Sequence, residues 1–148
     1  MSIEKEIKSK KFRSQKMKAM LNVIFTANWW NAHTAEELKP FDLTISQFNV
    51  LRILRGSMPD SLPVQEIKAR MLDKTPNMTR LLGTLEKKEM IERLQCADDR
   101  RIFHINISEK GLKTLGKIDV KMKRSDQRIN ITEEEAILLS DLLDKVRS

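Results

Sequence analysis

Apolar side chains recur every three or four positions through most of this chain, which is the spacing of helices with one buried face. The longest such stretch, residues 3–38, contains no proline or glycine, and Pro40 follows it. The pattern predicts a single long helix over residues 3–38. Its apolar positions include Met17, Leu21, Ile24, Phe25, Trp29, Ala32 and Leu38. A small domain has no room to bury so long a helix on two faces, so we expect it to pack against another subunit.

Capping signals divide the next part of the chain into shorter helices. Thr44 and Gln47 have the spacing of a capping box and begin a helix that closes on Gly56. A short helix is predicted over residues 64–72. Another begins at Pro76, with Thr75 as its N-cap. Two short helices separated by a tight break are a helix-turn-helix candidate.

Alternation of apolar and polar residues predicts a small β-hairpin after these helices. Its strands are expected over residues 90–95 and 101–107. A hairpin directly after a helix-turn-helix is a wing. Two more helices follow, one capped by Ser108 and one opened by a capping box of Thr132 and Glu135.

Composition and charge point to a soluble chain with a polyanionic partner. The 148 residues suffice for about one domain, and the net charge of +7 favours nucleic acid or an acidic membrane surface. No apolar run approaches the roughly 20 residues that span a bilayer, so we expect a cytoplasmic protein. Residues 4–18 hold seven Lys or Arg and two Glu. They form either a solvated helix face or an additional phosphate contact.

The residues needed for catalysis or metal binding are scarce. Cys96 is the only cysteine, His33 and His104 are the only histidines, and there is no tyrosine. Four glycines form no phosphate-binding loop. We therefore expect no enzymatic activity, no metal and no cofactor. A redox switch at Cys96 remains open as an alternative.

Four stretches of the sequence resemble the MarR family (multiple antibiotic resistance regulators). They are "LTISQFNVLRIL", "TRLLGTLEKKEMIERL", "DDRR" and "ISEKGLKTL". The resemblance implies a mainly α fold with a small β-wing, a winged helix-turn-helix with N- and C-terminal dimerisation helices. Residues 41–107 would be the DNA-binding lobe, and residues 1–40 and 108–148 the dimerisation region. Leu72 and Glu89 stand where many relatives carry glycine.

Members of this family are homodimers that bind pseudopalindromic double-stranded promoter DNA. They are commonly repressors, released by small phenolic or carboxylate ligands or by oxidation. The resemblance thus implies a dimeric, sequence-specific regulator, with a non-specific architectural DNA-binding protein or a redox-responsive regulator as alternatives. A protein interaction module that has kept the winged helix is a further reading, which the retained DNA-contact residues disfavour.

The DNA-contact residues follow from the helix-turn-helix and the resemblance. A helix in the major groove reads bases near its N-terminus, and a bidentate amide such as that of Asn77 can pair with adenine. Lys74 is expected on a phosphate. By resemblance, Arg101 enters the minor groove, Asp99 orients it, and Arg100 is a phosphate or second groove contact. The predicted DNA-binding set is Lys74, Thr75, Pro76, Asn77, Thr79, Arg80, Asp99, Arg100 and Arg101.

An effector pocket is expected by resemblance between the dimer helices and the DNA-binding lobe. The first predicted helix offers Trp29, Trp30 and His33 to it, and the second offers Phe48 and Arg52. The tryptophan pair has an ordinary alternative role in core or dimer packing. Arg52 would bind a ligand carboxylate or pair with an acidic side chain of the protein.

Overall fold

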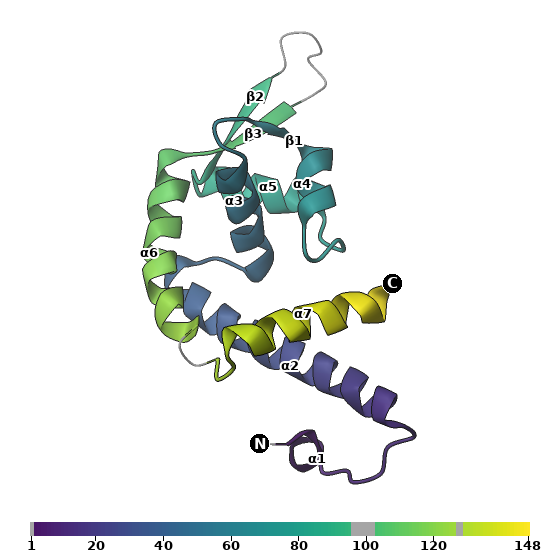
Figure 1. Ribbon diagram of the computed structural model, residues 1–148. Coiled ribbons are helices and arrows are strands. Elements are labelled where there is room, and N and C mark those ends of the chain that lie inside the picture. The colour runs from purple at the N-terminus through teal and green to yellow at the C-terminus, as the bar shows by residue number, and fades with distance from the viewer. Residues whose placement is uncertain (1, 96–102, 127–128) are drawn as a thin grey trace.

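The computed structural model describes residues 2–95, 103–126 and 129–148, and it is mainly helical with one small sheet (Figure 1). The helices and the 3-10 turn are α1 (Ile3–Glu6), α2 (Gln15–Leu38), η1 (Lys39–Phe41), α3 (Ile45–Ser57), α4 (Val64–Arg70), α5 (Met78–Lys87), α6 (Glu109–Asp126) and α7 (Glu133–Arg147). The strands are β1 (Leu62–Pro63), β2 (Ile91–Gln95) and β3 (Phe103–Ile107). A winged helix-turn-helix with flanking helices is the architecture that the sequence predicts.

The sheet is antiparallel with the order β1-β3-β2. Leu62 lies opposite Ile105, and Ile91 lies opposite Ile107. The alternation predicted for the second strand is present, because Ile105 and Ile107 are buried. The strand pair β2–β3 therefore carries one apolar face into the core.

Residues 3–38 do not form the single helix that the sequence predicts. The chain leaves α1 after Glu6, Lys8 adopts a left-handed conformation with φ 52°, and α2 begins at Gln15. Ser14 caps α2, since its side chain accepts a hydrogen bond from the Met17 amide at 3.1 Å. Between the two helices, closely spaced positive charges repel one another and weaken helix formation. The apolar spacing was right for residues 15–38 and wrong for the residues before them.

The predicted capping boxes of α3 and α7 are both present. Thr44 and Gln47 exchange two hydrogen bonds at the start of α3, at 3.1 and 3.2 Å. Thr132 and Glu135 do the same at the start of α7, at 2.9 and 3.3 Å. These local signals fix the helix starts independently of tertiary packing.

The core lies in the lobe formed by α3, α4, α5, α6 and the sheet. Its fully buried side chains include Leu51, Ile67, Leu85, Ile105, Leu115 and Ile118. Helix α2 reaches this core only near its C-terminal end, where Thr34 and Leu38 are buried. Helix α7 has no buried residue. None of the helices formed by the described residues is long and apolar enough to cross a membrane.

A close contact joins the start of α6 to the segment after α5. Ser108 caps α6 as predicted: its hydroxyl accepts from the Gly111 amide at 3.0 Å and donates to the Glu89 carbonyl at 2.7 Å. A Cβ atom at Gly111 would lie 2.3 Å from the Met90 carbonyl oxygen. Glycine at 111 therefore lets α6 approach the backbone that enters β2.

Candidate nucleic-acid interface

Helix α5 has one buried apolar face and one exposed polar face. Met78, Leu82 and Leu85 are buried. Thr79 and Arg80 lie on the opposite, exposed face. Burial of one face fixes the rotation of the helix, so its polar face is presented outward.

The second helix of the helix-turn-helix begins two residues later than the sequence predicts. Thr75 is not its N-cap and Pro76 is not its first residue. Asn77 is the N-cap, because its side-chain oxygen accepts a hydrogen bond from the Arg80 amide at 3.0 Å. An asparagine cap satisfies a free amide at the helix start, and a threonine followed by proline has no advantage over it. The side-chain NH₂ of Asn77 is left to donate outward.

Thr75 instead stabilises the turn before α5. Its hydroxyl donates to an Asp73 carboxylate oxygen at 2.6 Å, and its amide donates to the same oxygen at 3.0 Å. These hydrogen bonds, that of the hydroxyl first, lower the pKa of the Asp73 carboxyl below its ordinary value. The turn is also held to α3, since the Leu72 amide donates to Asn49 Oδ1 at 2.9 Å. Leu72 occupies this turn without a positive φ angle, and its side chain is exposed.

The predicted recognition residues around this helix start are accessible. Lys74, Thr75, Asn77, Thr79 and Arg80 are exposed, and Pro76 is half-buried. Neither Lys74 nor Arg80 forms an ion pair with another residue of the described chain. Their charges are thus available to an anion from outside the lobe.

The wing is anchored to the recognition helix by charge. Arg93 Nε on β2 lies 2.8 Å from Glu86 Oε2 on α5, with the guanidinium partly buried. At the other edge of β3, Ser61 Oγ lies 3.2 Å from His104 Nδ1. These contacts fix the direction in which the strands leave the lobe.

The residues at the end of the wing lie outside the described residues. They include Asp99, Arg100 and Arg101, the three predicted wing contacts, and Cys96, the predicted redox candidate. Their roles remain predictions from the sequence.

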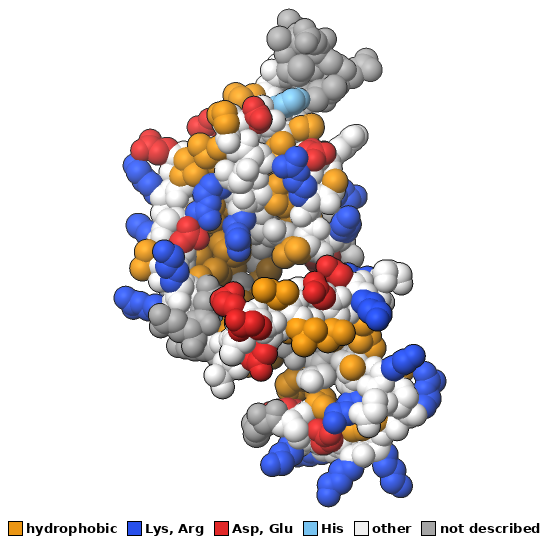
Figure 2. Space-filling model, viewed as in Figure 1, with side chains coloured by type: hydrophobic (Ala, Val, Ile, Leu, Met, Phe, Trp, Pro, Cys, Tyr) orange, Lys and Arg blue, Asp and Glu red, His pale blue; other side chains and the backbone are white. Residues whose placement is uncertain are grey.

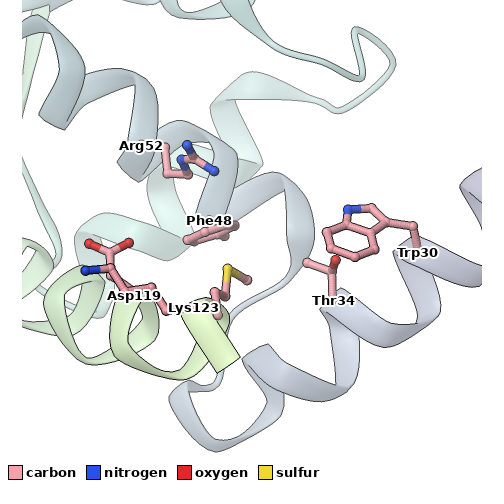
Figure 3. Close-up of a pocket in the computed structure, with 7 residues that line it drawn as sticks. Trp30, Thr34, Phe48, Arg52, Asp119 and Lys123 are labelled. Atoms are coloured by element: carbon pink, nitrogen blue, oxygen red, sulfur yellow. The ribbon is translucent and has the colours of Figure 1, made fainter. Parts of the chain in front are cut away.

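A cavity of about 350 Å³ lies between α2, α3 and α6. Figure 3 shows Phe48 and Arg52 of α3 on one side, Trp30 and Thr34 of α2 on another, and α6 completing the wall. The guanidinium carbon of Arg52 lies 5.7 Å from the centroid of the Phe48 ring, a cation–π distance. The α6 residues are Asp119, Met122 and Lys123.

The structure brings together three of the five predicted effector residues. Trp30, Phe48 and Arg52 line the cavity, whereas Trp29 lines a groove between α1 and α2. His33 lines a smaller cavity with Trp30, beside Glu37 and Ser125. The Trp29 and His33 rings stack on each other, with 6.3 Å between centroids.

Four cavity residues were not predicted from the sequence: Thr34, Asp119, Met122 and Lys123. No sequence pattern on α6 could place Asp119, Met122 and Lys123 at the cavity, because the crossing of α6 with α2 and α3 depends on tertiary packing. A polar residue inside an otherwise apolar helix face, as Thr34 is, was the only available signal.

Comparison with known proteins shows a family match in the lobe and a shared fold over most of the chain. Residues 43–103 match the model of the MarR family. A MarR-like transcription regulator from Bacillus cereus has 19% sequence identity and a TM-score of 0.78, covering 90% of this chain and 96% of that one. MepR of S. aureus, solved in complex with DNA, has 23% identity and a TM-score of 0.77, covering 86% of this chain and 94% of MepR.

A MarR transcription factor from Planctomyces limnophilus has 24% identity and a TM-score of 0.69, covering 93% of this chain and 96% of that one. These structures share the fold of the described chain, including the helices on both sides of the lobe. The match over residues 43–103 adds the sequence of the lobe itself. Residues 43–103 thus match the MarR family, and the fold of the chain is similar to that of MarR-like transcription regulators.

Proposed function

We propose that this protein is a dimeric, sequence-specific DNA-binding repressor whose binding to promoter DNA is relieved by a small ligand. The observation that carries the proposal is the polar face of α5, which buried Met78 and Leu82 turn outward in a fold shared with DNA-bound MepR. A helix in that position reads the major groove. No enzymatic step is part of the proposal.

Residues of α5, of the turn before it and of the wing contact different parts of the DNA. Thr79 and Arg80 face the base edges, with Arg80 reaching guanine or a phosphate. Asn77 donates from its side-chain NH₂ while its oxygen caps the helix. Lys74, Thr75 and Pro76 approach the DNA backbone from the turn. Arg101, oriented by Asp99, enters the minor groove of the same duplex, with Arg100 beside it.

The homodimer would be built from the first and last helices. Exposed apolar side chains on α2 include Val23, Ile24, Phe25 and Trp29, and those on α7 include Ile137, Leu138, Leu139, Leu142 and Val146. An unburied apolar helix is costly in water, and a second copy would cover both stripes. Residues 1–40 and 108–148 would then form the dimerisation region and residues 41–107 the DNA-binding lobe.

The cavity between α2 and the lobe suits a small aromatic acid or phenol. Trp30 and Phe48 offer aromatic walls, and Arg52 and Lys123 offer positive charge. A ligand there would touch helices of both the lobe and the dimerisation region. If the ligand binds one relative arrangement of the lobe and the dimerisation region more tightly than another, it shifts DNA affinity. The shift equals the coupling free energy between ligand binding and DNA binding.

Selection of bound duplexes from a random pool tests the proposal. A consensus of two inverted half-sites is expected, with selection weakened by 4-hydroxybenzoate or a related phenolic carboxylate. The variant Arg101→Ala should weaken binding to the selected site by roughly 1–3 kcal/mol. Equal recovery of all sequences would overturn the proposal and favour the non-specific architectural alternative.

A further inference from the structure

The N-terminal segment holds much of the positive charge of the chain. Residues 4–18 contain seven Lys or Arg and two Glu, in a chain whose net charge is +7. In the described structure this segment includes α1, the turn after it and the first residues of α2. The function proposed above places this segment in the dimerisation region and gives its charged side chains no contact.

The segment is folded back onto α2. Ile3 is only 5% exposed, and Glu4 forms an ion pair with Lys18 on α2. The ammonium group of Lys18 also lies 5.8 Å from the centroid of the Phe12 ring. The turn between α1 and α2 is thus held against the helix at both of its ends, which gives its side chains a defined surface.

This surface, defined here by Lys8, Lys10, Lys11 and Arg13, is positive and uncompensated. All four side chains are exposed. None of them pairs with a carboxylate among the described residues, and the nearby carboxylate of Glu4 is engaged by Lys18. Charges held close together without partners raise the local concentration of a polyanion.

The surface lies far from the recognition helix. In Figure 1 the N-terminal segment and the wing occupy opposite ends of the chain, and in Figure 2 a group of Lys and Arg side chains marks the N-terminal end. Helix α2 separates this segment from the lobe and has 24 residues, or about 36 Å at 1.5 Å per residue. That separation exceeds the Debye length of about 10 Å at 0.1 M salt. Charges at the far end of α2 are therefore screened from α5 and contribute little to phosphate binding there.

The chemistry of the surface favours DNA over a bilayer. An interfacial membrane helix needs an exposed apolar face beside its charges. Here α1 has four residues, Ile3 is buried and Phe12 is half-buried, so Ile7, at 38% exposed, is the one exposed large apolar side chain of residues 2–14 and forms no apolar face. Duplex DNA, with one charge per about 1.7 Å of axis, requires only positive charge at the surface.

We propose that Lys8, Lys10, Lys11 and Arg13 bind a second duplex segment while α5 and the wing hold the first. The protein would thereby bring two stretches of DNA together. The inference rests on the proposed function for the first duplex only. The second contact is with phosphate and so has no sequence preference.

A bridging assay with the full chain tests the proposal. A selected duplex is fixed to beads, and capture of a fluorescent duplex of unrelated sequence is measured with protein present. If four phosphates are contacted, capture affinity should fall about a hundredfold between about 50 and 200 mM salt. The variant K8Q/K10Q/K11Q/R13Q should lose capture and bind the selected duplex alone as the unmodified protein does.

A matched variant controls for the loss of charge. K113Q/K117Q/R124Q/K145Q removes the same number of positive charges from exposed positions on α6 and α7, and it should keep capture. Retained capture by the N-terminal variant would overturn the proposal. Parallel loss of single-duplex binding would also overturn it, because the segment would then serve the first duplex.

Two further outcomes separate this proposal from its alternatives. If capture depends on the four residues with any bead-bound duplex, and no sequence is preferred, the second surface stands and the proposed sequence-specific function fails. If the protein binds vesicles containing an anionic phospholipid through these residues and does not bridge duplexes, the partner is a membrane and the proposal is wrong.

Discussion

The guanidinium of Arg55 on α3 is paired with the carboxylate of Asp119 on α6, with Nη1 2.6 Å from Oδ2 and Nη2 3.3 Å from Oδ1. Asp119 also lines the cavity that contains Arg52 and Lys123. The same carboxylate thus joins α3 to α6 and lowers the positive charge available to a ligand in the cavity.

Replacing Asp119 should separate these two roles. Both partners are about one-third or more exposed, so Asp119→Asn should lower the free energy of unfolding by no more than about 1 kcal/mol. The variant should bind 4-hydroxybenzoate more tightly, because Arg52 and Lys123 lose a competing negative charge. Calorimetric titration measures the affinity, and Asp144→Asn on α7 serves as control. Weaker binding by Asp119→Asn would show that the carboxylate does not compete with the ligand.

Asn77 is expected to cap α5 and to contact DNA with different atoms. Asn77→Ser keeps an oxygen at the N-cap, so stability should change by only about 0.5 kcal/mol, whereas Asn77→Ala should lose about 1 kcal/mol. Both variants lack the side-chain NH₂ and should lose roughly 1–3 kcal/mol of preference for the selected base. Urea unfolding and DNA titration measure the two effects. Full sequence preference in Asn77→Ser would exclude the amide as a base contact.

Gly111 is expected to be intolerant of any side chain. The alanine Cβ would lie 2.3 Å from the Met90 carbonyl oxygen and 2.8 Å from Ile107 Cγ1, so Gly111→Ala should destabilise the protein by about 2–3 kcal/mol. Gly116 lies in the same helix with nothing within 4 Å of its built Cβ. Gly116→Ala should therefore stabilise by up to about 1 kcal/mol. Thermal unfolding of the two variants measures these effects. Equal shifts of the melting temperature would show that α6 does not approach the Met90 carbonyl closely in solution.

The ion pair of α1 should be visible in a pH titration. The hydrogen bond from Lys18 lowers the pKa of the Glu4 carboxyl to about 2. Because the folded pKa is below the ordinary value, the contribution of this pair is complete above pH 4.5 and is lost as the pH falls towards 2. The Glu4 carboxyl carbon, followed by NMR, should titrate near pH 2. Lys18→Gln should return it towards the ordinary range, and an ordinary midpoint in the unmodified protein would contradict the docking of α1.

Local signals predicted much of the fold because they act within a few residues. The capping boxes at Thr44 and Thr132 form as expected, since both partners belong to one turn of helix. The alternation in β3 likewise predicts that Ile105 and Ile107 are buried. Spacing alone was misleading where charge opposed it, as in the turn before α2.

Positions with special backbone conformations were harder to predict. Glu89, where relatives often have glycine, adopts φ 58° at the end of α5, and its carbonyl accepts from Ser108. Leu72 has no positive φ angle, although the family resemblance places a glycine at this position in many relatives. Whether a residue must adopt a positive φ angle depends on the direction that the chain takes after it. That direction is set by the packing of the lobe.

The sequence by itself determined the helix-turn-helix, the paired strands after it and the capped starts of α3, α6 and α7, because periodicity and caps are local. Only the tertiary structure decided that Asn77 rather than Thr75 caps α5, that Asp119 and Lys123 share a cavity with Arg52, and that the basic segment lies far from the lobe. These facts depend on where helices cross, and crossing is fixed by burial of side chains that are distant in the chain.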